Sequence, residues 1–144
     1  MDWIVYYKSI CEAVASKSKD PKIKVGCILV DRKRHLILSQ GMNGAPHGYP
    51  DEKINWQNRD FNDENSMRFQ IIHSEANAIY NSHVNLQTYN GIVEAYCTLA
   101  PCLECCKALI QCGIKAIYYW TDWRGSELSK RMANDCGIIY TKIG

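Results

Sequence analysis

The pattern of apolar and polar positions divides the first part of the chain into a helix and a hairpin. Apolar side chains recur at helical spacing over residues 2–17, where Asp2 is suited to cap the N-terminus. The Ser-Lys-Asp-Pro segment at 18–21 ends this helix. An apolar run over 25–30 then predicts a buried strand, which the polar residues that follow turn back into a second strand over 36–40.

The middle of the chain loses this periodicity. From residue 41 to about residue 70 the sequence is rich in Gly, Pro, Asn and Asp, which predicts a loop. Compact domains seldom carry so long a loop without a functional reason, so we expect it to wall a substrate pocket. Helical spacing returns at His73 and predicts a helix that continues to about residues 82–83.

The remainder of the chain alternates strands with helices. The predicted strands cover 92–98, 114–120 and 137–140, and the predicted helices cover 102–112 and 125–136. Gly113 is suited to the left-handed end of the first of these helices. Helices between successive strands imply parallel neighbours joined by right-handed crossovers. We therefore expect an α/β fold, a three-layer α/β/α sandwich around one mixed five-stranded sheet, with residues 1–144 as a single domain.

Charge and hydropathy limit the classes of partner. The formal net charge is +2, the pI is near 8.1, and no basic run resembles a surface that follows a nucleic-acid backbone, so we expect no nucleic-acid partner. No apolar run approaches the length of a membrane span, and the N-terminal residues do not form a secretory signal. The expectation is therefore a cytoplasmic protein with no membrane partner.

Cysteine is abundant, with eight residues in the chain. In a reducing compartment most of them are expected to be free thiols that pack as small buried hydrophobes. This expectation covers Cys11, Cys27, Cys97, Cys106, Cys112 and Cys136. The other two form a Cys-x-x-Cys pair and belong to the motif that carries the chemistry.

That motif is His73-Ser74-Glu75 followed by Pro101-Cys102 and Cys105. Cys-x-x-Cys places two sulfurs on one side of a turn, where both can reach one ion, and His73 supplies a third zinc ligand. A catalytic zinc uses three protein ligands and leaves a position for water, whereas a structural zinc uses four. Glu75 then stays free to move protons. Pro101 suits a helix start, so we expect the site at helix N-termini, where thiolates are favoured.

Two other interpretations of the pair exist. Cys-x-x-Cys can be a redox pair or half of a structural zinc site. A redox pair, however, has no need of His73, and the order His-x-Glu followed by Pro-Cys-x-x-Cys is the signature of zinc-dependent nucleobase deaminases.

With these residues in place, the chain resembles the cytidine deaminase superfamily and, within it, the deoxycytidylate (dCMP) deaminases. The resemblance covers most of the chain. It includes the turn at 18–21 followed by Val25-Gly26, the loop from Gly41 to Pro46, Asn77 to Ile79, and Thr98-Leu99 before the proline. Two positions depart from the usual pattern, Ser74 in place of alanine and Met42 in place of tyrosine.

The resemblance implies a cytidine-deaminase-like fold and hydrolytic deamination of dCMP to dUMP and ammonia, which supplies dUMP for thymidylate synthesis. One catalytic Zn²⁺ per subunit is expected on His73, Cys102 and Cys105, where it lowers the pKa of a water. Glu75 is the expected proton shuttle, and the Ala100 carbonyl is expected to accept from the exocyclic amine of the base.

Substrate contacts rest on residue chemistry. Asn43 is a candidate ligand of the sugar hydroxyl, although Asn-Gly is also ordinary turn chemistry. Several basic residues can bind phosphate or remain as solvated surface charge; these are Lys19, Lys22, Lys24, Arg59 and Arg68. Trp56, Trp120 and Trp123 can stack on a base, but burial in the core is the favoured interpretation.

The resemblance also implies a homo-oligomer, a hexamer or a dimer, that dCTP activates with Mg²⁺ and dTTP inhibits through a site near Asn43 and Gly44. Three alternatives stay open, namely an enzyme that also deaminates dCTP, a tRNA adenosine deaminase and a non-catalytic zinc-binding module. A free-cytidine deaminase is disfavoured by the helix expected between the last two strands. Leu99-Ala100 before Pro101 argues against the tRNA enzymes, and Glu75 argues against a binding module.

Overall fold

The computed structural model describes all of residues 1–144 and contains one five-stranded sheet with four helices. The strands are β1 (Gly26–Asp31), β2 (Leu36–Met42), β3 (Val93–Leu99), β4 (Ala116–Thr121) and β5 (Ile139–Lys142). The helices are α1 (Trp3–Ser16), α2 (Ser74–Tyr80), α3 (Leu103–Gln111) and α4 (Ser126–Asp135). The predicted strand and helix bounds agree with these to within one or two residues, except that α2 ends earlier than expected.

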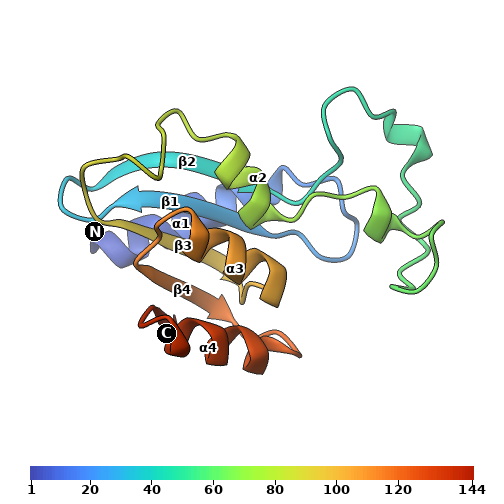
Figure 1. The fold of residues 1–144 in the computed structure, drawn as a ribbon. Coiled ribbons are helices and arrows are strands. Elements are labelled where there is room, and N and C mark those ends of the chain that lie inside the picture. Colours follow the sequence, from blue (N-terminus) through green and yellow to red (C-terminus); the bar gives the residue numbers. More distant parts are fainter.

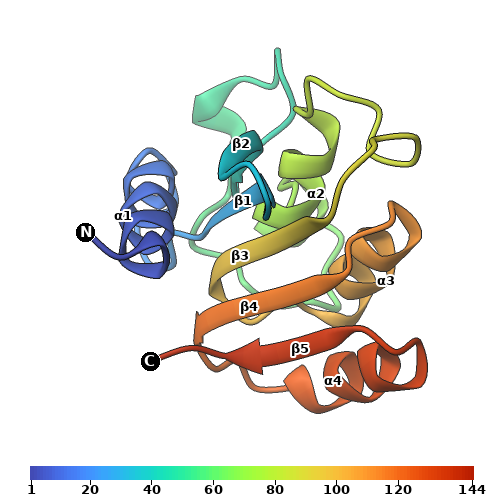
Figure 2. The same ribbon diagram turned by 90° about the vertical axis from the view of Figure 1, so that its left-hand side faces the viewer.

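The strands lie in the order β2-β1-β3-β4-β5. β1 is antiparallel to both β2 and β3, whereas β3, β4 and β5 are parallel, so the sheet is mixed as expected. In Figure 2, α1 lies alone on one face of the sheet, and α2, α3 and α4 cover the other. The fold is therefore the three-layer sandwich that the alternating elements predict.

Two hydrophobic clusters hold the layers together. The larger one lies between strands β1, β3 and β4 and the helices α2, α3 and α4 that cover this face of the sheet. Leu29, Leu109 and Ile117 are fully buried in it. The smaller one joins α1 to the opposite face through Tyr7, Cys11 and residues of β1 and β3. β1 is buried at all six positions because helices pack on both of its faces.

The ends of α1, α3 and α4 have specific caps. Asp2 Oδ1 accepts from the Ile4 amide at 2.7 Å, as predicted for the N-cap of α1. α3 ends at Gly113, whose φ of +95° suits glycine, and the Ile114 amide donates to the Leu109 carbonyl at 3.1 Å. Gly137 ends α4 in the same way, with a φ of +71°.

Two other glycines allow the helices to approach the β1–β2 hairpin closely. A Cβ on Gly26 would lie 2.3 Å from the Cys11 carbonyl oxygen of α1, and a Cβ on Gly41 would lie 2.3 Å from the Ala78 amide nitrogen of α2. Cys27 on β1 pairs with Gly41 on β2, so these contacts lie at the same end of the hairpin. The helix that begins after His73 therefore rests directly on strand backbone.

The long segment between β2 and α2 contains two short 3-10 helices, Asp51–Lys53 and Met67–Phe69, and projects from the body of the molecule (Figure 1). An isolated bridge between Gly44 and Ile72 brings its two ends together. Sequence patterning did not predict these short elements. The closed base of the loop fixes the chain that enters α2.

All eight cysteines are free thiols. Cys11, Cys27, Cys97 and Cys106 are buried, as expected. Cys112 is only partly buried and Cys136 is exposed, so the expectation of burial is wrong for these two. They occupy the C-caps of α3 and α4, where the chain turns at the surface.

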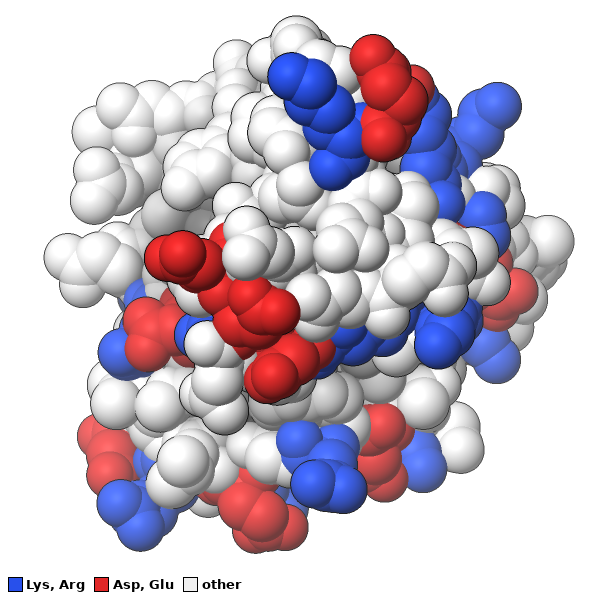
Figure 3. Space-filling view, turned by 90° about the vertical axis from the view of Figure 1, so that its right-hand side faces the viewer, with Lys and Arg blue, Asp and Glu red and all other residues white.

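None of the helices combines the length and apolar character that a membrane crossing requires. Figure 3 views the end of the molecule from which the long loop projects, with Lys and Arg interspersed among Asp and Glu and large uncharged areas between them. No continuous basic stripe crosses this face.

Candidate active site

The motif residues meet where two helices begin. His73 is the N-cap of α2 and Cys102 is the N-cap of α3, while Cys105 lies in the first turn of α3. α2 and α3 pack against each other on the same face of the sheet (Figure 2). The positive ends of both helix dipoles therefore act on this point, as the Pro-Cys sequence predicts.

The three candidate donors form a compact set. His73 Nδ1 lies 3.5 Å from Cys102 Sγ and 3.4 Å from Cys105 Sγ, and all three donor atoms lie within 4.8 Å of one another. One tetrahedral zinc with Zn–N near 2.1 Å and Zn–S near 2.3 Å requires N-to-S separations of roughly 3.5 Å. The donor set therefore fits zinc in both chemistry and spacing. It is the one cluster of this kind in the chain, and His47 does not belong to another.

Glu75 lies on α2 beside these donors and is 4% exposed. Ser74 Oγ donates to Glu75 Oε1 at 2.7 Å. The serine that stands in place of the usual alanine therefore holds the carboxylate. Burial raises the pKa of Glu75, although the hydrogen bond from Ser74 acts in the opposite direction. A raised pKa makes the carboxylate a stronger proton acceptor, which suits a group that takes up a proton and returns it.

The two thiols and the imidazole shift one another's pKa values. A hydrogen bond from Cys105 is the largest cause that lowers the pKa of Cys102, to about 4, and the same bond raises the pKa of Cys105. The hydrogen bond to Cys102 raises the pKa of His73. The lowered pKa of Cys102 favours its thiolate, which is the form that binds a metal.

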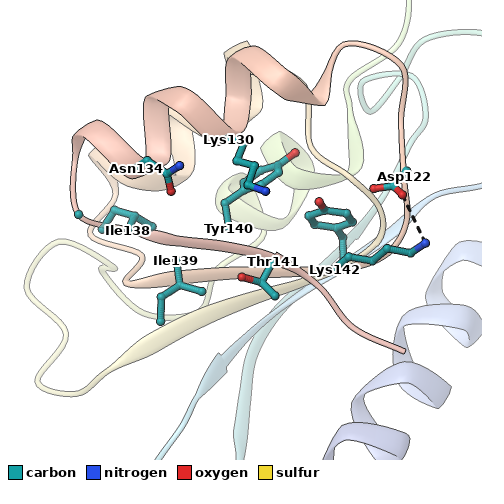
Figure 4. A pocket seen from close by; sticks show the side chains of 10 residues that line it. Asp122, Lys130, Asn134, Ile138, Ile139, Tyr140, Thr141 and Lys142 are labelled. Atoms are coloured by element: carbon teal, nitrogen blue, oxygen red, sulfur yellow. Dashed lines mark ion pairs between the residues drawn. The ribbon is translucent and has the colours of Figure 1, made fainter.

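A cavity of about 360 Å³ opens beside the motif, and His73, Glu75 and Cys102 line it. The long loop contributes Arg59, Phe61, Met67, Arg68 and Ile71 to its wall. The expectation that this loop walls a pocket is therefore confirmed. A larger hollow of about 590 Å³ lies between α4 and β5 and is lined by none of the motif residues (Figure 4).

Asn43 and Ala100 line the cavity, and Gly44 follows Asn43. The Asn43 side chain is already engaged, since its Oδ1 accepts from the Val25 amide at 2.9 Å and its Nδ2 donates to the Ile23 carbonyl at 2.9 Å. These contacts are those of a residue that fixes the loop. Ala100 is 3% exposed, and its amide donates to the Thr121 carbonyl, which anchors the segment before Cys102.

The expected phosphate ligands separate into two groups. Lys19 pairs with Asp51 and Lys24 donates to the Ser18 carbonyl, and neither lines the cavity, so the structure does not bring them to the site. Arg68 does line it, with its guanidinium 5.4 Å and 5.5 Å from the rings of Phe61 and Phe69. Stacking holds this cation at the wall.

Arg59 also lines the cavity, but both of its terminal nitrogens donate to Asp20, which is 1% exposed. Burial acts to raise the pKa of Asp20, yet the Arg59 guanidinium and the amides of Lys22 and Ile23 outweigh it and leave the pKa lowered. Sequence reasoning missed this pair because 39 residues separate its members.

Trp123 was expected in the core, and the structure corrects this. Its side chain is 37% exposed and lines the cavity mouth after the end of β4. Trp56 and Trp120 are half-buried. The segment after β4 leaves the sheet at the edge where the cavity opens, which a local pattern does not reveal.

Comparison with known proteins connects this site to a family. Residues 1–121 match the family described as the cytidine and deoxycytidylate deaminase zinc-binding region. A probable deoxycytidylate deaminase of Drosophila melanogaster is 32% identical over 99% of this chain and 72% of its own length. The deoxycytidylate deaminase of Homo sapiens is 32% identical over 99% of this chain and 80% of its own length.

A solved structure gives the same result. The crystal structure of dCMP deaminase from the cyanophage S-TIM5, in complex with dCMP and dUMP, superposes with a TM-score of 0.75 at 26% identity, covering 97% of this chain and 95% of that one. The matched segment contains His73, Glu75, Cys102 and Cys105. The chain therefore belongs to the cytidine and deoxycytidylate deaminase family and is a deaminase with that family's zinc-binding region.

Proposed function

We propose that this protein hydrolyses dCMP to dUMP and ammonia. The observation that carries the proposal is the buried Glu75 carboxylate beside the His73, Cys102 and Cys105 donors, at the wall of a cavity sized for a small molecule. The names of the relatives and the dCMP-bound structural neighbour support dCMP as the substrate.

In this proposal His73, Cys102 and Cys105 are the zinc ligands and Glu75 moves the protons. Bound zinc supplies a water that is reactive at neutral pH. Glu75 would accept a proton from that water and pass it to ring N3 as the oxygen adds to C4. It would then take the remaining proton from the new hydroxyl on C4 and give it to the amine, so that C4 becomes a carbonyl, the C4–N bond breaks and ammonia leaves. In the same proposal the backbone carbonyl of Ala100, a buried residue that lines the cavity, accepts from the exocyclic amine.

Arg68 is the proposed phosphate ligand. Its guanidinium lines the cavity and has no carboxylate partner, whereas Asp20 neutralises Arg59. Arg68→Ala should lower kcat/KM for dCMP about 10- to 100-fold, the value of a hydrogen bond to a charged group. The kcat/KM of the same variant for deoxycytidine, which lacks the phosphate, should fall little. The matched control is Arg124→Ala, an exposed arginine that does not line the cavity.

Regulation by dCTP with Mg²⁺ and by dTTP, together with assembly into a hexamer or dimer, is part of the proposal. If this part of the proposal holds, a plot of initial rate against dCMP concentration is sigmoidal and becomes hyperbolic when dCTP is added. Hyperbolic kinetics that neither nucleotide changes would remove regulation from the proposal and leave the deaminase activity intact.

The deciding experiment measures ammonia release from dCMP, dCTP, CMP, deoxycytidine and a tRNA anticodon loop, with zinc quantified on the same sample. The expected result is about one zinc per chain and the highest kcat/KM with dCMP. A preference for dCTP or for the tRNA loop would overturn the substrate. No release from any of them by the zinc-loaded protein would overturn the catalytic role.

A further inference from the structure

A second cavity, of about 360 Å³, lies on the opposite face of the sheet from the Glu75 site. α1, the turn between β1 and β2, and strands β3 and β4 form its walls. Aromatic rings dominate these walls, from Trp3 and Tyr7 on α1, Tyr96 on β3 and Tyr118 on β4. We refer to these four residues together with Glu94 as the aromatic cage.

The rings of the cage are in contact. The centroids of Tyr7 and Tyr96 are 4.8 Å apart, and those of Tyr96 and Tyr118 are 5.2 Å apart. Burial first and the charge of Glu94 second raise the pKa of Tyr7, Tyr96 and Tyr118, so the phenols stay neutral. Their π faces carry partial negative charge, which favours a cation.

Glu94 supplies a formal negative charge among these rings. Its side chain is 5% exposed, and its Oε1 accepts from the Tyr96 hydroxyl at 3.0 Å. The nearest cation is Arg32, whose Nε lies 3.8 Å from Oε2, beyond hydrogen-bond length, on a side chain that is 64% exposed. Buried carboxylates are normally paired with a cation, and the distant, exposed Arg32 leaves Glu94 open to a closer cationic partner.

The rim of the cage is fixed in an uncommon conformation. His35 is the one non-glycine residue with a positive φ, at +53°. Its ring stacks on Trp3 at 3.9 Å, and Tyr7 Oη lies 2.5 Å from its Nδ1. Strained backbone of this kind is often found at ligand clamps, and here it holds Trp3 and Tyr7 in place.

The donor set selects the kind of cation. Ca²⁺ and Mg²⁺ require several oxygen ligands, and this cavity offers one carboxylate among hydrocarbon rings. An alkylammonium ion matches both features, because its apolar groups pack on the rings while its charge faces Glu94. We propose that the aromatic cage binds the head group of a small organic ammonium ion, primary or methylated, that is free in solution.

Titration with choline, tetramethylammonium and putrescine, followed by calorimetry and thermal unfolding, tests the proposal. At least one of these ions should bind saturably and raise the Tm, whereas sodium chloride at equal ionic strength and the neutral carbon isostere of choline should not. Glu94→Gln keeps the side-chain shape and should weaken binding by at least about tenfold. Activity against dCMP should be unchanged, because Glu94 does not line the Glu75 cavity.

Arg32→Ala provides a test of opposite sign that does not depend on Glu94→Gln folding. It removes the competing cation and should tighten binding, while Lys33→Ala, a charge removed from the same turn with no ion pair, should not change it. Equal binding of choline and its neutral isostere, or weaker binding by the Arg32 variant, would overturn the proposal. So would concentration-dependent self-association that ammonium ions dissolve, since the cage would then hold a side chain of a second copy.

Discussion

Replacing Glu75 with glutamine separates catalysis from stability at a single side chain. Glutamine has the same shape, and its side-chain oxygen can still accept from Ser74 Oγ, which lies 2.7 Å from Glu75 Oε1. The variant loses only the ability to carry a proton. General acid–base catalysis typically contributes about 10²- to 10⁴-fold, so kcat for dCMP should fall by that factor with little change in KM.

The zinc-depleted form of the same variant should be at least as stable as the zinc-depleted wild type. Burial raises the pKa of Glu75, so the group stabilises the fold fully only below its unfolded pKa of about 4.3, and this contribution is lost as pH rises through the folded pKa. At neutral pH the carboxylate therefore opposes folding of the zinc-depleted protein. Glu75→Gln removes that cost, and its Tm after chelation should equal or exceed the wild-type value.

The assay is ammonia release by protein whose zinc content has been measured, together with thermal unfolding of the zinc-depleted form. The matched control is Glu104→Gln. Glu104 is an exposed residue next to Cys105, and its carboxylate pairs only with Lys107. Near-normal turnover by zinc-loaded Glu75→Gln would refute the proton-shuttle assignment. An equal loss in the Glu104 variant would show that charge near the site, and not proton transfer, sets the rate.

Three further substitutions test the frame of the site. Cys102→Ala should lose most bound zinc and activity, whereas Cys112→Ala at the far end of α3 should keep both, as measured by metal content and ammonia release. Asp20→Asn leaves Arg59 without its partner and should lower the free energy of unfolding by about 2 to 4 kcal/mol at pH 7, less than for a fully buried pair because Arg59 is 25% exposed. Because the folded pKa of Asp20 is lowered, its contribution is present above the unfolded pKa of about 3.9 and lost as pH falls through the folded value, so urea unfolding of wild type and variant should converge in acid. Gly41→Ala should cost at least about 2 kcal/mol and reduce activity, because its Cβ would meet the backbone of α2, whereas Gly44→Ala, with nothing within 4 Å, should change the Tm little.

Local pattern accounts for the elements and the motif. The order of helices and strands follows from apolar periodicity, and the donors of the site follow from His-x-Glu and Cys-x-x-Cys at helix starts, since helix geometry brings such neighbours together. The antiparallel pairing of β1 with β3 had no sequence signal, because residues 32–92 lie between the two strands.

Long-range contacts account for what local pattern missed. Lys19 and Lys24 were candidate phosphate ligands because of their charge, but Lys19 pairs with Asp51 of the long loop, Lys24 donates to the Ser18 carbonyl, and neither lines the cavity. Arg59 and Asp20 meet only because the long loop contacts the turn after α1. Trp123 lines the cavity because of where β4 ends. Each outcome depends on where distant segments pack, which residue type alone does not encode.

The contact of α1 and α2 with the hairpin through Gly26 and Gly41 bears on how far such a sequence can diverge. Where side chains set the distance between two elements, a change of size in the core shifts one against the other. Here backbone atoms set the distance between α2 and β2. Core side chains can therefore be exchanged without a change in that distance. Contacts of this kind allow the fold to persist while the sequence changes, as in the structural neighbour with a TM-score of 0.75 at 26% identity.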